Sequence, residues 1–579
     1  MRVLGIEGTA WCASAALYDV ETDTVLIESD PYEPDSGGIH PREAAEHMSE
    51  AIPEVVDAVL TAAEAEHGPD AIDAVAFSKG PGLGPCLRTV GTAARALAGT
   101  LDVPLVGVNH MVAHLEIGRH RSGFESPVCL NASGANAHLL GYHDGRYRVL
   151  GETMDAGVGN AIDKFTRHVG WDHPGGPKVE AAAAEAAAER EPDAELLDLP
   201  YVVKGMDFSF SGISSAANDA FDDGVPVEEI CFSLQEHVFA MLTEVAERAL
   251  SLTGADELVL GGGVAQNDRL REMLATMCAA RGADFHAPEP RFLRDNAGMI
   301  AVLGAEMAAA GDAVSIDESA IDPNFRPDQV PVTWRDGDAS IADAEGGRRG
   351  DGDADRRGAE ATVEVAAAAD GGADRRVIKR RVRKRYRHPE LDRTLRRDRT
   401  VAEARLTNEA RRAGVPTPLV YDVDLRRSTL TLQHVGDRDL AADLDERWTA
   451  AVGRHLARLH RGGIVHGDPT TRNVRVDGTA AAAPDPSGSE ATAADADGPP
   501  ERVAADRDAR TTLIDFGLAY HTGHVEDHAM DLHVFEGSVR ATATDPAPLI
   551  EAFEAGYAET GDGAVLDRLR EVEGRGRYR

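Results

Sequence analysis

The sequence predicts an α/β domain over residues 1–330, followed by a smaller α+β domain over residues 356–579. The chain has 579 residues, which is more than one ordinary domain holds. Along the first domain, short apolar runs alternate with Ala-rich amphipathic stretches, the pattern of an α/β fold. Residues 331–355 are rich in Asp, Gly and Arg without periodicity, which predicts a flexible linker. A low-complexity stretch at about 478–507 is expected to be an insertion in the second domain.

Strands and helices are expected in turn along the first domain. The expected strands are Val3–Ile6, Ala13–Val20, Ile72–Phe77, Pro104–Val108, Val128–Ala132 and Leu258–Gly261. The expected helices cover residues 42–66, 179–190, 229–253 and 267–281. Two of the strands run into turns of small polar residues, and a third ends in three glycines.

The composition favours a folded protein of a reducing compartment. Hydrophobic residues make up 42% of the chain, which is enough for real cores. No apolar run approaches the roughly 18 residues that span a bilayer, and the N-terminus resembles a strand and not a signal peptide. The cysteines are scattered without a CxxC pair, which argues against a structural zinc site or a disulfide scaffold. A cytoplasmic protein is expected.

The net charge of −39 at first argues against a nucleic-acid partner. However, the chain has only six lysines, so nearly all of its 60 basic residues are arginine. Many acidic residues with few lysines are typical of proteins from a salt-saturated archaeal cytoplasm. At molar salt the Debye length is roughly 3 Å, so the acidic surface repels RNA little. The charge therefore indicates a halophile and does not exclude RNA.

One segment has the opposite charge. From Arg375 to Arg412 the chain carries 16 Lys or Arg against 5 Asp or Glu. A solvated helix face is one explanation. In so acidic a chain, a role in contacting phosphate groups is the expectation.

A pair of histidines suggests a metal site in the first domain. His110 and His114 follow an expected strand and stand four residues apart, so on a helix both imidazoles can reach one metal. The spacing alone is weak evidence. Met111 occupies the position where the metalloprotease motif HExxH has its glutamate, which disfavours a zinc peptidase.

Many further motifs occur in a fixed order around this pair. They are Gly5-Ile-Glu-Gly-Thr9, Gly80-Pro-Gly-Leu-Gly84, Asn109-His-Met-Val-Ala-His114, Asn131-Ala-Ser-Gly-Ala135, Gly159-Asn-Ala-Ile-Asp-Lys-Phe165, His173-Pro-Gly-Gly-Pro-Lys178, Lys204-Gly-Met-Asp-Phe-Ser-Phe-Ser-Gly212, Gly261-Gly-Gly-Val-Ala-Gln-Asn267 and Arg294-Asp-Asn-Ala297. In these motifs, residues 1–327 resemble the universal transferase that makes threonylcarbamoyladenosine in tRNA. The resemblance implies an actin-like fold, in which a ribonuclease-H-like unit is duplicated.

The resemblance also implies the ligands. One iron ion, expected as Fe²⁺ with zinc as an alternative, would be bound by His110, His114 and Asp295. Threonylcarbamoyl-adenylate would be bound by the residues that match the family motifs: Asn131, Ala132, Ser133, Gly134, Ala135, Asp163, Gly176, Glu180 and Asn267. The implied reaction transfers the threonylcarbamoyl group to the N6 amine of the adenosine 3′ of the anticodon, in tRNAs that read codons beginning with A. No general base is evident from the sequence.

The second domain contains the spacing of a kinase catalytic loop. In His466-Gly-Asp-Pro-Thr-Thr-Arg-Asn473, Asp468 would be the catalytic base and Asn473 a magnesium ligand. Asp515 in Leu513-Ile-Asp-Phe-Gly517 would be the second magnesium ligand. Upstream, Lys379 would contact the ATP phosphates and Glu403 would be its ion-pair partner. A GxGxxG loop is missing from the sequence, and Gly358-Ala-Glu-Ala361 stands in its place.

These departures, with Tyr386-Arg-His-Pro-Glu-Leu-Asp392, resemble the small atypical serine/threonine kinase of the KEOPS tRNA-modification complex. The resemblance covers about residues 356–579. It implies a domain that binds ATP and Mg²⁺, hydrolyses ATP in support of the transferase and can phosphorylate itself or its partners. It also implies tRNA and other KEOPS subunits as partners. The basic end of the chain, Arg575–Arg579, would suit contact with the tRNA backbone.

Three other functions are compatible with parts of the sequence. A metallopeptidase is disfavoured by Met111. An actin-like sugar kinase would share the fold but would not need a metal at His110, His114 and Asp295. A non-enzymatic signalling scaffold would tolerate loss of the kinase residues, yet these are present.

Overall fold

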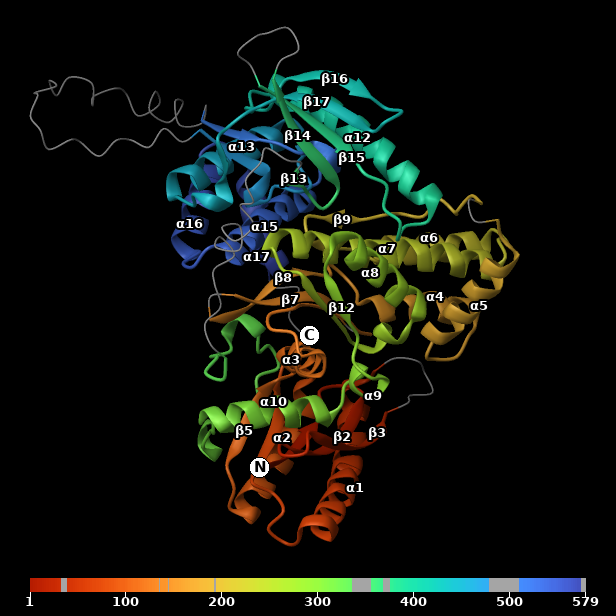
Figure 1. The fold of residues 1–579 in the computed structure, drawn as a ribbon, viewed down its shortest axis with the longest axis vertical. Coiled ribbons are helices and arrows are strands. Elements are labelled where there is room, and N and C mark those ends of the chain that lie inside the picture. The colour runs from red at the N-terminus through yellow and green to blue at the C-terminus, as the bar shows by residue number, and fades with distance from the viewer. Residues whose placement is uncertain are drawn as a thin grey trace, which may run out of the picture.

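A computed structural model of the chain describes residues 1–32, 39–134, 136–143, 145–191, 194–335, 356–367, 375–477 and 510–573 (Figure 1). Ala135, most of the expected linker, the expected insertion at 478–507 and the basic end of the chain therefore lie outside the described residues. Among the described helices, none combines the length and the apolar character needed to cross a membrane.

The first half contains two five-stranded sheets of the same topology. The first sheet has the order β3-β2-β1-β4-β5 and the second the order β12-β11-β6-β7-β8. In each sheet the first strand along the chain is central, the next two strands follow it as antiparallel hairpins on one side, and the later two strands pair in parallel on the other side. The strands are β1 (Arg2–Glu7), β2 (Cys12–Asp19), β3 (Thr24–Pro31), β4 (Ala74–Gly80), β5 (Leu105–Asn109), β6 (Val128–Ala132), β7 (Ala137–His143), β8 (Arg146–Glu152), β11 (Glu257–Gly261) and β12 (Asp284–His286). This repeat is the duplicated α/β unit that the sequence predicts.

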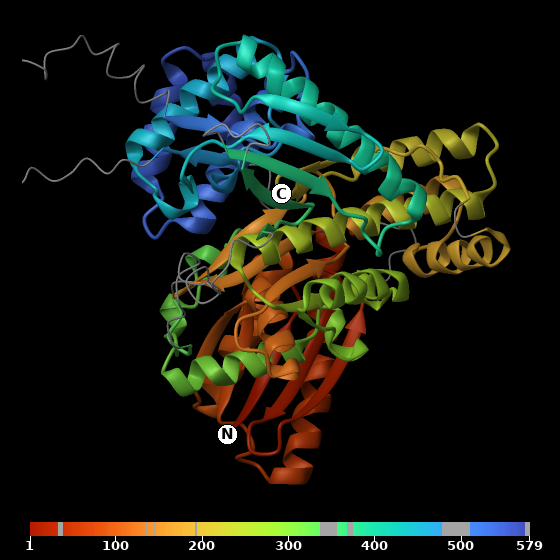
Figure 2. The same ribbon diagram turned by 45° about the horizontal axis from the view of Figure 1, so that its top comes forward.

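Helices separate and cover the two sheets (Figures 1 and 2). One apolar cluster joins the first sheet to α1 (Pro41–His67) and α2 (Gly84–Leu101). A central cluster joins both sheets to α3 (His110–Ser122) and α10 (Ala297–Ala310), which lie between them. The outer face of the second sheet packs on α4 (Val158–Val169), α5 (Gly176–Glu189), α6 (Ser211–Asp222), α7 (Val227–Thr253) and α8 (Asp268–Arg281). The layers are therefore helix, sheet, helix, sheet, helix.

Short elements complete the first half. They are β9 (Val203–Lys204), β10 (Asp207–Phe208), α9 (Pro290–Leu293) and the 3-10 turns Gly263–Gln266, Ile316–Glu318 and Pro327–Gln329. The hairpin of β9 and β10 lies against the second half.

The second half is an α+β unit. Its antiparallel sheet has the order β13-β14-β15-β17-β16, formed by Arg356–Arg357, Ala361–Ala367, Arg375–Arg381, Thr429–Gln433 and Val420–Asp424. The long helix α12 (Pro389–Arg412) follows β15 along the chain. The rest is mainly helical, with α13 (Glu446–Arg461), α15 (Val525–Thr542), α16 (Ala547–Ala558) and α17 (Gly563–Glu573). The small strands are β18 (Arg438–Asp439), β19 (Ile464–Val465), β20 (Val474–Val476), β21 (Thr511–Leu513) and β22 (Tyr520–His521). One apolar cluster unites the helices.

The second half rests on the outer helices and the β7–β8 edge of the first half (Figures 1 and 2). The contact is close: the backbone amide of Gly205, between β9 and β10, donates a hydrogen bond of 3.0 Å to the carbonyl of Gly467. Arg148 of β8 donates hydrogen bonds to the carbonyl of Arg540, which lies on α15, and to the carbonyl of Ala543, which directly follows α15.

Candidate functional sites

The two histidines lie on the first turns of α3, in the layer between the sheets. The side chain of Asn109 caps this helix by accepting hydrogen bonds from the amides of Met111 and Val112. The rings of His110 and His114 are 4.9 Å apart between centroids. Their spacing thus has the predicted effect of putting both imidazoles on one helical face.

Asp295, between α9 and α10, completes the cluster. Its Oδ1 lies 3.4 Å from Nε2 of His110 and 3.2 Å from Nε2 of His114. Trp11 Nε1 donates a 3.1 Å hydrogen bond to Oδ2 of Asp295, so the other carboxylate oxygen, Oδ1, faces the histidines. Burial alone would raise the pKa of Asp295, but the neighbouring His110 outweighs it and holds the pKa well below its usual range.

These three side chains fit a metal ion. Their donor atoms lie within 4.8 Å of one another, and they are the only such group in the part of the chain that the structure describes. Two imidazoles and one carboxylate suit a first-row transition metal and leave positions open for a substrate oxygen. The carboxylates of Glu7 and Asp295 outweigh burial and raise the pKa of His110 to about 10, so the environment favours a cation.

Glu7 also belongs to the site, although the sequence shows it only as one residue of the motif Gly5–Thr9. Its carboxylate accepts a 3.2 Å hydrogen bond from Nδ1 of His110, and it is fully buried. Thr9 donates to the same carboxylate through its amide and its hydroxyl, and Ser78 donates a further hydrogen bond. This carboxylate fixes the His110 ring with Nε2 toward Asp295, as supporting carboxylates do at metal sites. The only sequence signal was an acidic residue within a motif at a strand end.

The expected adenylate-binding residues gather around the end of the second sheet. Asn131 is the last residue but one of the central strand β6 and pairs with Gly261 of β11. The following turn packs on the start of α4: the amide of Gly159 donates to the carbonyl of Ser133, and the amide of Asn160 donates to that of Gly134. Ala132 lies in β6.

The remaining members of this set have local partners. Asp163 accepts a hydrogen bond from the amide of Gly175, next to Gly176 at the start of α5. Glu180 accepts from the amide of Asp268, and Asn267 caps α8. The structure thus brings them onto adjoining helix ends, while their role in binding the adenylate stays a prediction.

The expected residues of the second site also meet. Lys379 Nζ lies 2.9 Å from Glu403 and 2.7 Å from Asp515. Asn473 Nδ2 donates a 2.9 Å hydrogen bond to the carboxylate of Asp468. Although burial opposes it, Lys379 lowers the pKa of Asp515 to about 2. The turn between β13 and β14 starts at Gly358, whose amide donates to the carbonyl of Ala361. Arg381, which the sequence analysis did not single out, lies 2.7 Å from Glu403.

An arginine of the first half reaches into this second site. Arg248 of α7 lies 3.0 Å from Oδ2 of Asp468, and it also pairs with Glu244 and Glu360 at 2.9 and 3.2 Å. Burial, opposed by Arg248 and reinforced by Asp515, raises the pKa of Asp468 to about 7. Nothing in the local sequence of α7 signals this contact.

The interface corrects one expectation about the basic segment. Lys384 lies 2.6 Å from Glu247, and Arg387 lies 2.6 Å from Glu244. Five cations of the segment are buried in ion pairs: Lys379, Arg381, Lys384, Arg387 and Arg399. Their partners are carboxylates of both halves. For Arg381, Lys384, Arg387 and Arg399 a role in contacting RNA phosphate groups is therefore wrong, whereas the contact of Lys379 with the ATP phosphates stays a prediction. The reason is physical: a buried cation needs an opposite charge, which α7 supplies to Lys384, Arg387 and Arg399 and which Glu403 supplies to Arg381.

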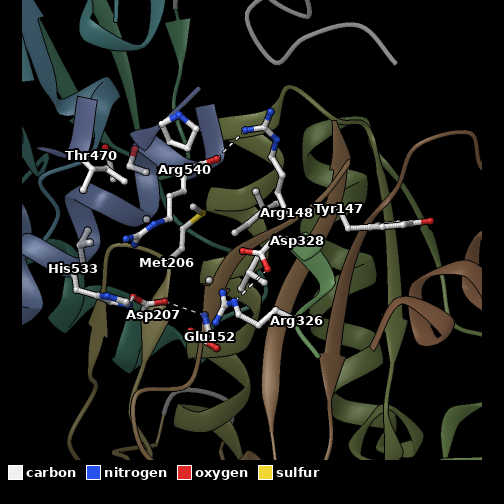
Figure 3. Close-up of a pocket in the computed structure, with 18 of the residues that line it drawn as sticks. Tyr147, Arg148, Glu152, Met206, Asp207, Arg326, Asp328, Thr470, His533 and Arg540 are labelled. Atoms are coloured by element: carbon white, nitrogen blue, oxygen red, sulfur yellow. Dashed lines mark hydrogen bonds and ion pairs between the residues drawn. The ribbon is translucent and has the colours of Figure 1, made fainter. Parts of the chain in front are cut away.

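A cavity of about 480 Å³ also lies between the halves (Figure 3). It is bounded by β8 and β10 of the first half and by α15 and α16 of the second. Asp207 in its wall accepts a hydrogen bond from the amide of Glu152, and burial raises the pKa of Asp207 to about 7. No sequence motif predicted this cavity.

The duplicated α/β unit, with two histidines and one carboxylate in its middle layer, defines the first half as an actin-like metal-site protein. Residues 22–302 match the family described as tRNA N6-adenosine threonylcarbamoyltransferase. The whole chain is similar to proteins described as "probable bifunctional tRNA threonylcarbamoyladenosine biosynthesis protein". That of Haloquadratum walsbyi is 63% identical over 583 residues, with 100% of both chains covered. That of Halobacterium salinarum is 65% identical over 581 residues, with 100% of this chain and 99% of the relative covered.

A more distant relative, from Methanospirillum hungatei, is 47% identical over 578 residues, with 100% of this chain and 99% of the relative covered. The chain therefore belongs to the family of bifunctional tRNA threonylcarbamoyladenosine biosynthesis proteins. The resemblance of the first half to the threonylcarbamoyladenosine transferase family is confirmed, while the resemblance of the second half to a kinase stays a prediction.

Proposed function

We propose that the first half transfers the threonylcarbamoyl group from threonylcarbamoyl-adenylate to the N6 amine of the adenosine 3′ of the anticodon, in tRNAs that read codons beginning with A. The observation that carries this is the cluster of His110, His114 and Asp295 near the end of β6, where Asn131 and His114 both approach Gly261. AMP leaves as the amine attacks the carbamoyl carbon. Because this amine is a weak nucleophile, positioning and charge stabilisation supply most of the rate.

Each residue near the metal cluster has a definable task. His110, His114 and Asp295 would hold an iron ion, which when bound supplies Lewis-acid polarisation of a substrate oxygen. Trp11 orients Asp295, and Glu7 orients His110. Neither orienting residue needs to touch the substrate.

The adenylate would lie at the end of the second sheet. The amides of Ser133 and Gly134 would face its polar groups, as amides of glycine-rich turns do for phosphates. Asp163 and Glu180 are carboxylate acceptors suited to ribose hydroxyls, with Asn267 and Gly176 beside them.

The second half is proposed to be a minimal protein-kinase-like domain that binds ATP and Mg²⁺. Lys379, held by Glu403, would contact the phosphates, while Asn473 and Asp515 would bind magnesium. Asp468 would orient the attacking oxygen. ATP hydrolysis by this domain would support threonylcarbamoyl transfer by the first half. Serine or threonine hydroxyls would be alternative acceptors of the phosphoryl group.

We assign tRNA contact to the exposed cations of the basic segment. Between residues 375 and 397 these are Arg375, Arg380, Arg383, Arg385, Arg393 and Arg397. This arginine-rich edge would contact the RNA backbone without reading its sequence. Other KEOPS subunits would be further partners, and the reaction would take place in the cytoplasm.

One experiment tests the central proposal. The chain is incubated with tRNA, threonylcarbamoyl-adenylate and ATP at high salt, and the nucleosides are analysed by mass spectrometry. Threonylcarbamoyladenosine at the position 3′ of the anticodon is the expected product. Unmodified tRNA together with metal-dependent cleavage of casein would instead support the peptidase alternative.

A further inference from the structure

A third histidine, His138, lies behind the metal cluster and has no task in the proposed mechanism. It stands on β7 directly opposite Asn131 of β6, and it is 2% exposed. Side chains alternate between the faces of a strand, and Leu140 on the same face packs into the central cluster with α3. His138 therefore faces α3, the helix that carries His114.

Four buried polar atoms in this region lack a hydrogen-bond partner among the described residues. They are Nδ1 and Nε2 of His138, Nδ1 of His114 and Oδ1 of Asn131. A methyl group at Gly261 would lie 3.7 Å from Asn131 Oδ1 and 3.8 Å from His114 Cβ, so these two side chains approach the same point. Buried polar atoms without partners are rare because leaving them unpaired is costly.

The unpaired atoms are chemically complementary. Nε2 of His114 points to Asp295 at 3.2 Å, so when it is a metal ligand the ring must carry its proton on Nδ1. Asn131 Oδ1 can only accept. A neutral His138 offers one N–H and one lone pair, which is what the two neighbours need.

We propose that His138 is a positioning residue for the metal site: it accepts a hydrogen bond from Nδ1 of His114 and donates one to Oδ1 of Asn131. It thereby holds Nε2 of His114 toward the metal, as Glu7 does for the other histidine. The inference rests on the proposed function, because it requires a metal at the cluster. It also extends that function, since the chain of hydrogen bonds would join a metal ligand to the strand end that is expected to bind the adenylate.

The test uses full-length protein freed of metal by a chelator and titrated with Co²⁺ alone at high salt. The variants are His138→Leu, which removes both polar atoms, and His138→Gln, which keeps a donor and an acceptor. His143→Leu on the same strand is the matched control, because it is the same change at another buried histidine. Affinity is measured by competition with a chromophoric chelator, geometry by the visible absorption of bound Co²⁺, and fold by thermal unfolding of the metal-free protein.

His138→Leu is expected to weaken Co²⁺ binding about 10- to 100-fold, the range seen when an outer partner of a metal ligand is removed. It should also shift the Co²⁺ absorption bands. His138→Gln should recover most of the affinity, and His143→Leu should bind like the wild type. Metal-free His138→Leu should unfold at the wild-type temperature or higher, since it loses no bond that exists without metal.

Two results would overturn the inference. One is wild-type affinity and spectrum in His138→Leu. The other is equal loss of affinity in the Leu and Gln variants with a lowered unfolding temperature, which would show a purely structural role. If the wild-type protein itself binds no Co²⁺ at the cluster, the proposed metal site fails, and that outcome is distinct from both.

Discussion

The guanidinium of Arg248 in the first half lies 3.0 Å from the carboxylate of Asp468 in the second half. This ion pair joins the helix α7 of the transferase half to the expected catalytic base of the ATP site. Any oxygen that Asp468 orients must therefore share the carboxylate with Arg248. The positive charge of Arg248 in the first half thus affects the ionisation of Asp468 in the second half.

The pH dependence of ATP hydrolysis should report this pair. Asp468 must be ionised to act, and its pKa is raised to about 7, so kcat/KM for ATP should rise with pH through this region. The charge of Arg248 keeps the pKa of Asp468 lower than burial alone would. Arg248→Met should therefore move the inflection to higher pH, whereas Arg248→Lys should stay closer to the wild type. An unchanged inflection in Arg248→Met would show that the pair does not persist in the active enzyme.

Removing Asp468 should show whether the two activities are linked. Asp468→Ala is expected to lower ATP hydrolysis by about 10²- to 10⁴-fold, the usual effect of losing a catalytic base. If ATP hydrolysis supports transfer, multiple-turnover tRNA modification should fall too, while metal content stays at the wild-type value. Normal sustained modification by this variant would mean that the two halves are merely tethered.

The metal cluster should be needed for transfer alone. His110→Ala or Asp295→Ala should abolish metal binding and threonylcarbamoyladenosine formation, because each removes one of three ligands. ATP hydrolysis should remain. His120→Ala on the same helix is the control, since its ring pairs with Asp23 and not with the cluster. Full metal stoichiometry in His110→Ala, measured by elemental analysis, would contradict the assignment.

The exposed arginines of the basic segment should contribute to tRNA binding. Arg383→Glu with Arg385→Glu should weaken tRNA binding and flatten its dependence on salt, because fewer counterions are released. An Arg→Glu change at the exposed Arg42 of α1, in the first half, serves as a control and should have little effect. Equal losses from both sites in a filter-binding titration would indicate a general charge effect.

Breaking the interface network should destabilise the whole chain. Glu244 pairs with Arg248, Arg387 and Arg399, so Glu244→Gln leaves buried cations undercompensated and should cost about 3–5 kcal/mol. Arg447→Ala, at an exposed pair with Asp445, should change the unfolding temperature little. Thermal unfolding measures both.

The pH dependence of this stabilisation follows from the lowered pKa values of Glu244 and Glu360, where the arginines outweigh burial. A group with a lowered pKa stabilises the fold above its unfolded-state pKa. The interface should therefore be stable at neutral pH and weaken as the pH falls through the acid range. A Glu244→Gln protein as stable as the wild type at pH 7 would contradict this account.

The sequence predicted local structure well and contacts between distant residues poorly. The expected helix at 229–253 is α7 (Val227–Thr253), and the expected strand Val128–Ala132 is β6, because apolar periodicity is a local signal. Strands β7 and β8 were not among the expected strands. Their polar residues (His138, His143, Arg146 and Arg148) interrupt the apolar pattern. His138 faces the metal layer, and Arg146 and Arg148 contact the second half.

The same limit applies to the sites. His110 and His114 are visible as a local spacing, whereas Asp295 was assigned only through resemblance to a family. Glu7 and Arg248 were missed, because a carboxylate in a turn and a cation on an amphipathic helix look like solvated groups until their partners are known. The burial of Arg387 was hidden for the same reason.

The buried charges at the interface bear on why one chain holds both activities. If the halves were separate proteins, α7 would expose Glu244 and Glu247 on one, and Lys384 and Arg387 would be exposed on the other. Such partners find each other through long-range attraction, which molar salt reduces to a reach of roughly 3 Å. A covalent connection replaces that attraction with an effective concentration in the millimolar range. The fused chain would thus keep its two active sites together in a medium where opposite charges alone would recruit a partner poorly.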